Sequence, residues 1–223
     1  MIRYETTKLF YDKYLYKLGV DNPLGFIFRN KNFSHARTVI DDLQFKLEEK
    51  ENLRYNFNMR HVDVVQEDLH DLKILLSELE STSNNMLRCE QRKIGIFSND
   101  DTWLKHVSKK LNCISDFYEP ADNTADLLLK NKNIIIKNTP FAYEFKVTLG
   151  GNSIDYNFYN WAKSNADKIR VSPGLMRRLA EKGYVSGKYL YLRDEKVLTL
   201  AMLFLSGNIS RVDRIVIKQD VDK

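Results

Sequence analysis

Cysteine is scarce in this chain. Its 223 residues include only Cys89 and Cys113, and the two lie in no spacing that is typical of a zinc or iron–sulfur site. Disulfides persist in oxidising compartments, whereas thiols stay reduced in the cytosol. We therefore expect two free thiols in a cytoplasmic protein without a structural metal.

Long hydrophobic runs are also missing. The most apolar stretch, VLTLAMLFL at residues 197–205, is much shorter than the roughly 20 residues that a membrane-spanning helix requires. The first residues do not have the pattern of a signal peptide. We expect a protein with no membrane partner. Asp194 precedes the apolar stretch and can cap a helix there, which should be buried because it is apolar on every side.

Motifs for catalysis are absent as well. The glycines of LGGNS, at residues 149–153, lack the Lys-Ser/Thr of a nucleotide-binding loop. The histidines form no metal-binding spacing. We therefore expect no cofactor and no enzymatic activity. The histidines are His35, His61, His70 and His106.

One enzymatic alternative is left open by an E-x-K pair. Glu144 and Lys146 lie on a predicted strand, as in nucleases whose Glu and an upstream Asp bind a metal while the Lys helps to activate water. Asp122 or Asp126 is the candidate upstream acid. The matching segment of the first half has Leu15 in place of the glutamate, which weighs against this alternative.

Charge is distributed unevenly along the chain. Residues 130–223 carry 17 Lys and Arg against nine Asp and Glu, whereas residues 34–85 carry six against eleven. A basic half beside an acidic or neutral one favours a polyanionic partner for the basic half.

A repeated order of elements is the strongest pattern that is present. Each half reads strand–helix–strand–helix–strand–helix–strand, and GIFSNDDTWL at residues 95–104 matches YLYLRDEKVL at residues 189–198. This order predicts an internal duplication of a ferredoxin-like, RRM-like α+β plait, with antiparallel sheets and helices on one face. In the first unit, residues 53–64 are the predicted second strand; in the second, KIRVS at residues 168–172 is a predicted edge strand. The predicted boundaries are 1–118, a linker at 119–140, and 141–223.

Alternation along the strands predicts which side chains face the helices. In AYEFKVTL the odd-numbered residues are apolar, so they should form the core and leave Lys146 on the open face. The same rule leaves Lys13 and Lys17 outside in the first unit. The predicted core residues are Tyr143, Phe145, Val147 and Leu149, and in the first unit Tyr14, Tyr16, Leu18 and Val20.

The third strand of the second unit predicts a binding surface. In KYLYLR the leucines should face the core, which leaves three residues on the open face beside Lys146. Aromatic rings flanked by cations on an open sheet can stack bases and hold phosphates. The predicted partner is single-stranded nucleic acid, RNA or DNA, and the predicted binding residues are Lys146, Tyr189, Tyr191 and Arg193. In the first unit, Ile94 and Ile96 at the matching positions predict a packing surface instead.

A second function class stays open beside this one. Exposed Tyr and Arg are also favoured in protein interfaces, so the open sheets could instead meet a protein partner or a second copy of the chain. A Lys- and Asn-rich chain without catalytic motifs is typical of a viral or phage accessory protein, which would act in the host cytoplasm. A structural or assembly protein is therefore the alternative to a nucleic-acid binder.

Overall fold

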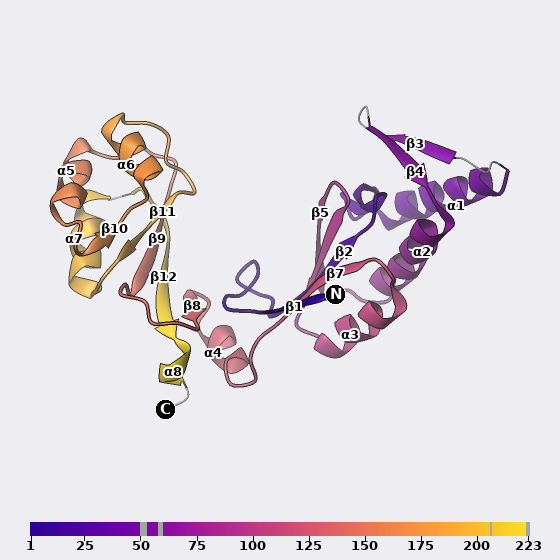
Figure 1. The fold of residues 1–223 in the computed structure, drawn as a ribbon, viewed down its shortest axis with the longest axis horizontal. Coiled ribbons are helices and arrows are strands. Elements are labelled where there is room, and N and C mark those ends of the chain that lie inside the picture. The colour runs from indigo at the N-terminus through magenta and orange to yellow at the C-terminus, as the bar shows by residue number, and fades with distance from the viewer. Residues whose placement is uncertain (50–52, 58–59, 206, 222–223) are drawn as a thin grey trace. The chain divides into compact units, whose positions relative to one another are not determined.

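The computed structural model describes residues 1–49, 53–57, 60–205 and 207–221 (Figure 1). The chain divides into two compact units, Met1–Ala125 and Asp126–Lys223, called unit 1 and unit 2 below. Both units mix helices with a five-stranded sheet, so the predicted α+β class is confirmed. No helix among the described residues has both the length and the apolar character needed to span a bilayer.

The sheet of unit 1 has the strand order β1-β7-β2-β6-β5. β1 runs parallel to β7, and the other neighbouring strands are antiparallel. The strands are β1 (Ile2–Glu5), β2 (Tyr16–Asp21), β5 (Asn85–Glu90), β6 (Lys93–Ser98) and β7 (Ile114–Glu119).

The helices of unit 1 share one hydrophobic core with the sheet. Leu18, Ile96 and Phe117 project from the three central strands into this core and are almost fully buried. The predicted core positions Leu18 and Val20 are confirmed, and Tyr16 packs against the same cluster. The helices are η1 (Gly25–Phe28), α1 (Phe33–Glu49), α2 (Gln66–Glu80) and α3 (Asp101–Lys110).

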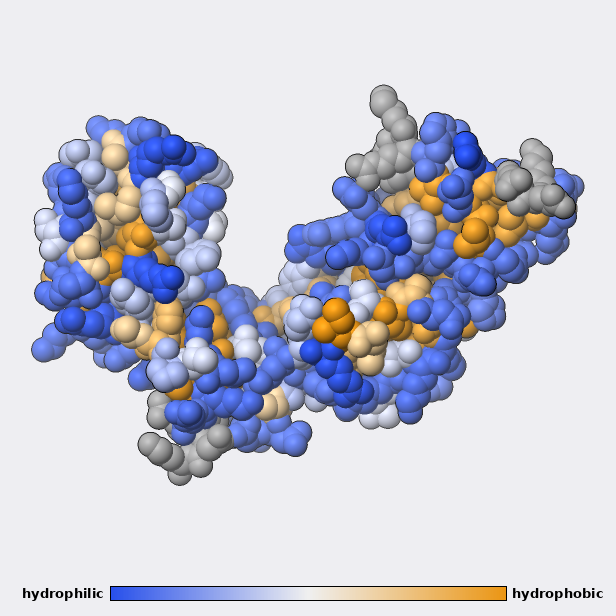
Figure 2. All heavy atoms as spheres, viewed as in Figure 1, coloured by the Kyte–Doolittle hydropathy of each residue, from blue (hydrophilic) through white to orange (hydrophobic). Residues whose placement is uncertain are grey.

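The predicted second strand at residues 53–64 is instead a separate hairpin, β3 (Leu53–Phe57) and β4 (Arg60–Val64). Residues 58–59, between the two strands, lie outside the described residues. Apolar residues fall on odd positions in β3 but on even positions in β4, and one extended strand cannot place both sets on the same face. A hairpin can, and the Tyr55 ring stacks on Phe26 at 5.8 Å. Figure 2 shows apolar residues at the surface beside this hairpin.

The sheet of unit 2 has the strand order β10-β11-β9-β12-β8. β8 runs parallel to β12, and the other neighbouring strands are antiparallel. The strands are β8 (Ile134–Lys137), β9 (Phe145–Leu149), β10 (Ile169–Arg170), β11 (Tyr189–Leu192) and β12 (Ile209–Ile217).

Helices of unit 2 begin after capping side chains, as the sequence predicts at Asp194. The Ser172 hydroxyl accepts a hydrogen bond from the Leu175 amide, and the Asp194 carboxylate accepts one from the Val197 amide, as helix N-caps do. The helices cover one face of the sheet (Figure 1). They are α5 (Tyr156–Ser164), α6 (Pro173–Ala180) and α7 (Glu195–Phe204); α4 (Ala125–Lys130) precedes β8, and α8 (Lys218–Val221) follows β12.

Helix α7 is not the buried helix that its composition predicts. Only Val197 and Ala201 are buried, whereas Leu203 is 72% exposed and Leu200 is 47% exposed. The helix lies in the outer layer of unit 2, so the side turned away from the sheet stays at the surface although it is apolar.

The first strand of each unit differs from the prediction. The predicted linker at 119–140 contains α4 and the strand β8, whose Ile134 and Ile136 are buried. β1 was likewise not predicted. Each sheet therefore has one strand more than the predicted plait, and that strand adds a parallel pairing to an otherwise antiparallel sheet.

The two sheets place their strands in the same order. When strands are counted along each unit, the first pairs with the last, the last with the second, and the second with the strand before α3 or α7. The edge strand on the other side is β5 in unit 1 and β10 in unit 2. The strands therefore have matching roles, although helix α6 separates β10 from β11 while β5 and β6 form a hairpin.

Candidate functional site

We call the five-stranded sheets of unit 1 and unit 2 sheet 1 and sheet 2, and the face of each sheet that points away from the helices its open face. Two tyrosines lie on the open face of sheet 2. Leu190 and Leu192 are fully buried in the core, so Tyr189 and Tyr191 project from the opposite face of β11. Tyr191 lies opposite Lys146 of β9. The Lys146 ammonium is 4.2 Å from the centre of the Tyr189 ring, and the two tyrosine rings meet edge to face at 5.5 Å. The structure thus brings three of the four predicted residues together.

Arg193 does not join this cluster. β11 ends at Leu192, and the Arg193 guanidinium points to two carboxylates, at 3.4 Å from Asp194 and 3.9 Å from Asp167. Its charge is therefore shared with acids at the start of α7 and in the loop before β10.

Tyr143 lies on the open face, and its predicted place in the core is wrong. Its ring is 5.5 Å from Phe141 and 6.3 Å from Tyr191. The chain bends at residues 142 and 144, so the alternation that holds from Phe145 onward does not extend back to Tyr143. Phe141, which the sequence did not single out, contacts the Tyr191 ring edge to face at 5.0 Å.

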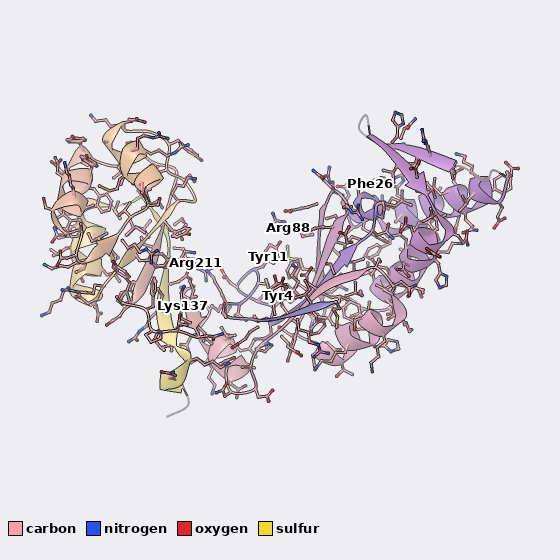
Figure 3. All side chains as sticks on the ribbon, viewed as in Figure 1. Tyr4, Tyr11, Phe26, Arg88, Lys137 and Arg211 are labelled. Carbon is pink, nitrogen blue, oxygen red and sulfur yellow. The ribbon has the colours of Figure 1, made fainter. Side chains whose placement is uncertain are left out.

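Further cations surround these rings. The Lys137 ammonium is 4.6 Å from the centre of the Phe141 ring, and Arg170 of β10 lies opposite Tyr191 in the sheet. Figure 3 labels Lys137, at the end of β8. A pocket of about 510 Å³ adjoins the two tyrosines, and Arg170 and Lys188 line it together with them. Arg170 reaches the site through strand pairing, which the sequence alone does not display, whereas Lys188 directly precedes Tyr189 in the chain.

A buried carboxylate balances part of this charge. Asp213 of β12 lies opposite Lys146, and its side chain is only 1% exposed. It forms an ion pair with Arg211, which Figure 3 labels. The sheet therefore contains a buried acid beside its cations, and this acid is paired with Arg211.

The Tyr191 hydroxyl keeps its proton over the physiological range. Burial, and then the neighbouring Tyr189, raise the pKa of this group above its ordinary value. Tyr191 therefore stays a neutral hydrogen-bond donor, and its ring carries no charge that would repel a phosphate.

The open face of sheet 1 repeats the same arrangement. Lys17 lies opposite Phe97, as Lys146 lies opposite Tyr191. The Phe97 ring contacts Phe10 at 5.3 Å and Tyr11 at 5.0 Å, just as Tyr191 contacts two rings from the segment before β9. In both units the connection between the first and second strands thus covers part of the open face with rings.

Ile94 and Ile96 do not belong to that face. Ile96 pairs with Leu18, and both are fully buried in the core. The residues on the open face are Gly95 and Phe97, because side chains alternate along β6. The predicted apolar packing surface in unit 1 is therefore wrong by one residue.

An ion pair lies across the centre of this face. The Lys17 ammonium donates to the Asp116 carboxylate at 2.8 Å, and the Ser115 hydroxyl donates to the same group. Gly19 makes room for it, because a Cβ there would lie 2.2 Å from an oxygen of Asp116. Burial raises the pKa of the Asp116 carboxyl, but the hydrogen bonds from Lys17 and Ser115 outweigh it and lower the pKa below its ordinary value.

Replacing Asp116 with asparagine should make the free energy of unfolding depend less on pH in the acidic range. The pKa of the Asp116 carboxyl is lower in the folded state than in the unfolded state, where it is near 4, so the ionised carboxylate stabilises the folded protein at pH values above about 4. This contribution disappears as the pH falls through the folded pKa. We expect the variant to be about 1–2 kcal/mol less stable at neutral pH and the difference to shrink below about pH 4. Urea unfolding at several pH values measures this. Asp41→Asn, an exposed position on α1, is the control, and a difference that stays constant down to about pH 3 would contradict the expectation.

The nuclease alternative requires an acid beside Glu144 and Lys146. Asp122 belongs to unit 1, whereas Asp126, Glu144 and Lys146 belong to unit 2. Asp122 and Glu144 are both exposed. Within the described part of the chain, no three His, Cys, Asp or Glu residues lie close enough to hold a metal ion.

Comparison of the chain with protein-family models, with curated proteins and with solved structures finds no match. The function therefore has to be inferred from the geometry of the two open faces.

Proposed function

We propose that the protein binds single-stranded RNA or DNA, without catalysis, through the open face of unit 2. The observation that carries this proposal is the exposed Tyr189 ring, 48% exposed, with the Lys146 ammonium 4.2 Å from its centre. A base can stack on such a ring, and a phosphate can bind the neighbouring cations. Arg170 and Lys188, which line the adjoining pocket, extend the cationic path.

The distribution of charge supports the same face. Unit 2 carries 17 Lys and Arg against 10 Asp and Glu, whereas unit 1 carries 18 against 20. The net positive charge of the chain therefore resides in the unit that has the exposed tyrosine. Such a charge attracts a polyanion and speeds its association.

We further propose that both units are ferredoxin-like, RRM-like plaits that arose by internal duplication. Without β1 and β8, the sheets have the orders β7-β2-β6-β5 and β12-β9-β11-β10, both entirely antiparallel. When the four strands of each unit are numbered along the chain, both orders read fourth, first, third, second, which is the strand order of the ferredoxin-like plait. The matching pairs Lys17–Phe97 and Lys146–Tyr191 support a common origin. RRM domains bind RNA on this face of the sheet.

We propose a cytoplasmic location. Both cysteines are free. Burial raises the pKa of Cys89 to about 11 and that of Cys113 to about 12, so neither thiol is a reactive thiolate at neutral pH.

Titration of labelled oligonucleotides tests the binding proposal. We expect the full chain to bind single-stranded RNA or DNA of about 12 nucleotides, measured by fluorescence anisotropy at several salt concentrations. If Lys146, Arg170 and Lys188 each contact a phosphate, the logarithm of the affinity should fall with the logarithm of salt with a slope of about −2. Gel analysis of the same samples with and without Mg²⁺ shows whether the oligonucleotide stays intact.

Four outcomes would count against the proposal. Absence of binding at low salt would refute it, as would binding that is insensitive to salt. Cleavage that requires Mg²⁺ and is lost in Glu144→Ala would favour the nuclease alternative. A second copy or a protein partner on the open sheets, detected by light scattering, would then favour an assembly role.

A further inference from the structure

A glycine in unit 1 stands where unit 2 has its exposed tyrosine. Gly95 lies two residues before Phe97, which is opposite Lys17, and Tyr189 lies two residues before Tyr191, which is opposite Lys146. Gly95 pairs with Gly19 on the neighbouring strand. Neither glycine carries a side chain, and the Asp116 carboxylate occupies the space above Gly19.

A pocket of about 500 Å³ lies over these two glycines. This volume is within the range of about 300–1,000 Å³ that is usual for small-molecule sites. Rings form one side of the pocket and charged groups form the others. The rings are Phe10, Tyr11 and Phe97, and the charged groups include Lys17, Arg88, Lys93 and Asp116.

We propose that this pocket binds a nucleotide, with the base in the place that the Tyr189 ring occupies in unit 2. A Cβ on Gly95 would lie 3.1 Å from the Phe97 ring and 3.6 Å from the Lys17 side chain. A flat ring placed over Gly95 would therefore contact both an aromatic ring and a lysine, as Tyr189 does. Nucleobases are planar rings that stack on such groups.

The polar groups of the pocket distinguish a nucleobase from a plain apolar ring. The Asp116 carboxylate is only partly exposed, and its oxygens can accept further hydrogen bonds from amino or imino groups of a base. A purely apolar ligand would cover these oxygens without providing a partner, which costs free energy. Lys93 and Arg88, which is paired with Glu90, also line the pocket and can bind a phosphate.

The ring side of the pocket is held in a defined position. Tyr11 and Asp12 have positive φ values, +52° and +56°, which are uncommon for residues other than glycine. An Arg88 guanidinium nitrogen donates to the Tyr11 hydroxyl at 3.3 Å, and Figure 3 shows the two side chains beside each other. Arg88 therefore links the ring side to the phosphate side across the pocket.

Every residue that lines this pocket belongs to unit 1, so the pocket is distinct from the proposed strand-binding surface of unit 2. The nucleotide could come from the free pool or from a bound strand. The chemistry is the same in both cases, so the experiment has to separate the two sources.

Isothermal titration of the full chain with AMP, GMP, CMP and UMP tests the proposal. We expect one binding site per chain for at least one of these nucleotides. Gly95→Tyr, which supplies a ring to the pocket, should weaken binding roughly tenfold or more. Tyr189→Ala should leave it unchanged, so failure of strand binding in unit 2 and failure of this inference give different results.

A second variant keeps the test valid if Gly95→Tyr does not fold, as judged by circular dichroism. Arg88→Gln leaves Gly19 and Gly95 unchanged and should weaken binding of the nucleotide but not of the matching nucleoside. Displacement of the mononucleotide by an oligonucleotide would identify a strand as the source, and retention would identify the free pool. Absence of binding for all four nucleotides, or equal binding by the wild type and both variants, would overturn the proposal.

Discussion

Replacing Tyr189 with alanine is expected to weaken binding of a single-stranded oligonucleotide roughly 5- to 150-fold, because stacking of a base on an aromatic ring contributes about 1–3 kcal/mol. The melting temperature should change little, since the ring is 48% exposed and projects from the face opposite the core. Fluorescence anisotropy and thermal unfolding measure the two quantities. Tyr191→Ala is less informative, because Tyr191 also contacts Phe141 and Tyr143.

Tyr156→Ala is the matched control. Tyr156 is 43% exposed and begins α5, whose Phe158 and Ala162 pack on the core face of the same sheet. The control therefore removes a similar ring from the opposite side of unit 2. Equal losses of affinity in both variants would mean that the open face has no special role, and unchanged affinity in Tyr189→Ala would contradict stacking on this ring.

Replacing Asp71 with alanine should have the largest effect on stability. Asp71 of α2 is 3% exposed, and its carboxylate accepts hydrogen bonds from the backbone amides of Asn112 at 3.0 Å and Cys113 at 2.9 Å. These amides lie between α3 and β7 and would lose their acceptor. A buried group left without a partner costs about 1–3 kcal/mol. Asn112 is exposed, so water can replace part of its lost hydrogen bond, and we expect a loss of about 2–4 kcal/mol in unit 1.

Unfolding in urea measures this loss if the signals of the two units are separated. Trp103 reports on unit 1 and Trp161 on unit 2, so fluorescence in a Trp161→Phe background follows unit 1 alone. Asp71→Asn keeps one acceptor oxygen and should lose less than Asp71→Ala. Asp41→Ala, an exposed aspartate on α1, is the control and should change stability by less than about 0.5 kcal/mol. A loss in Asp71→Ala no larger than in this control would show that the carboxylate does not hold β7.

The parts of the fold that were predictable depend on neighbours in the sequence. The capping side chains of Ser172 and Asp194 bond amides three residues away, and the alternation of Leu190 and Leu192 with the tyrosines needs only a single strand. Such signals are local, so they can be recognised without knowledge of the partner strand.

The strands that were missed depend on partners far along the chain. Ile2 pairs with Asp116, and Ile134 pairs with Arg214. β1 and β8 have only four residues each, too few for a clear period. A short strand is stabilised mainly by the strand beside it, and that neighbour is not visible in the local pattern.

The candidate site was predictable to the extent that it follows from alternation. Lys146, Tyr189 and Tyr191 share a face because two regular strands pair in register. Arg193 was misplaced because β11 ends before it, and Tyr143 because the chain bends before β9. Arg170 comes to the site through the pairing of β10 with β11, which no motif in the sequence indicates.

The parallel pairing of the first and last strands has a consequence during synthesis on the ribosome. β1 cannot pair until β7 has left the exit tunnel, more than a hundred residues later, and β8 cannot pair until β12 has been made. A nascent chain that stops before residue 209 leaves β8 without a neighbour and exposes one edge of β9. Unit 1 can close while unit 2 is still being translated, so the basic unit is completed after unit 1.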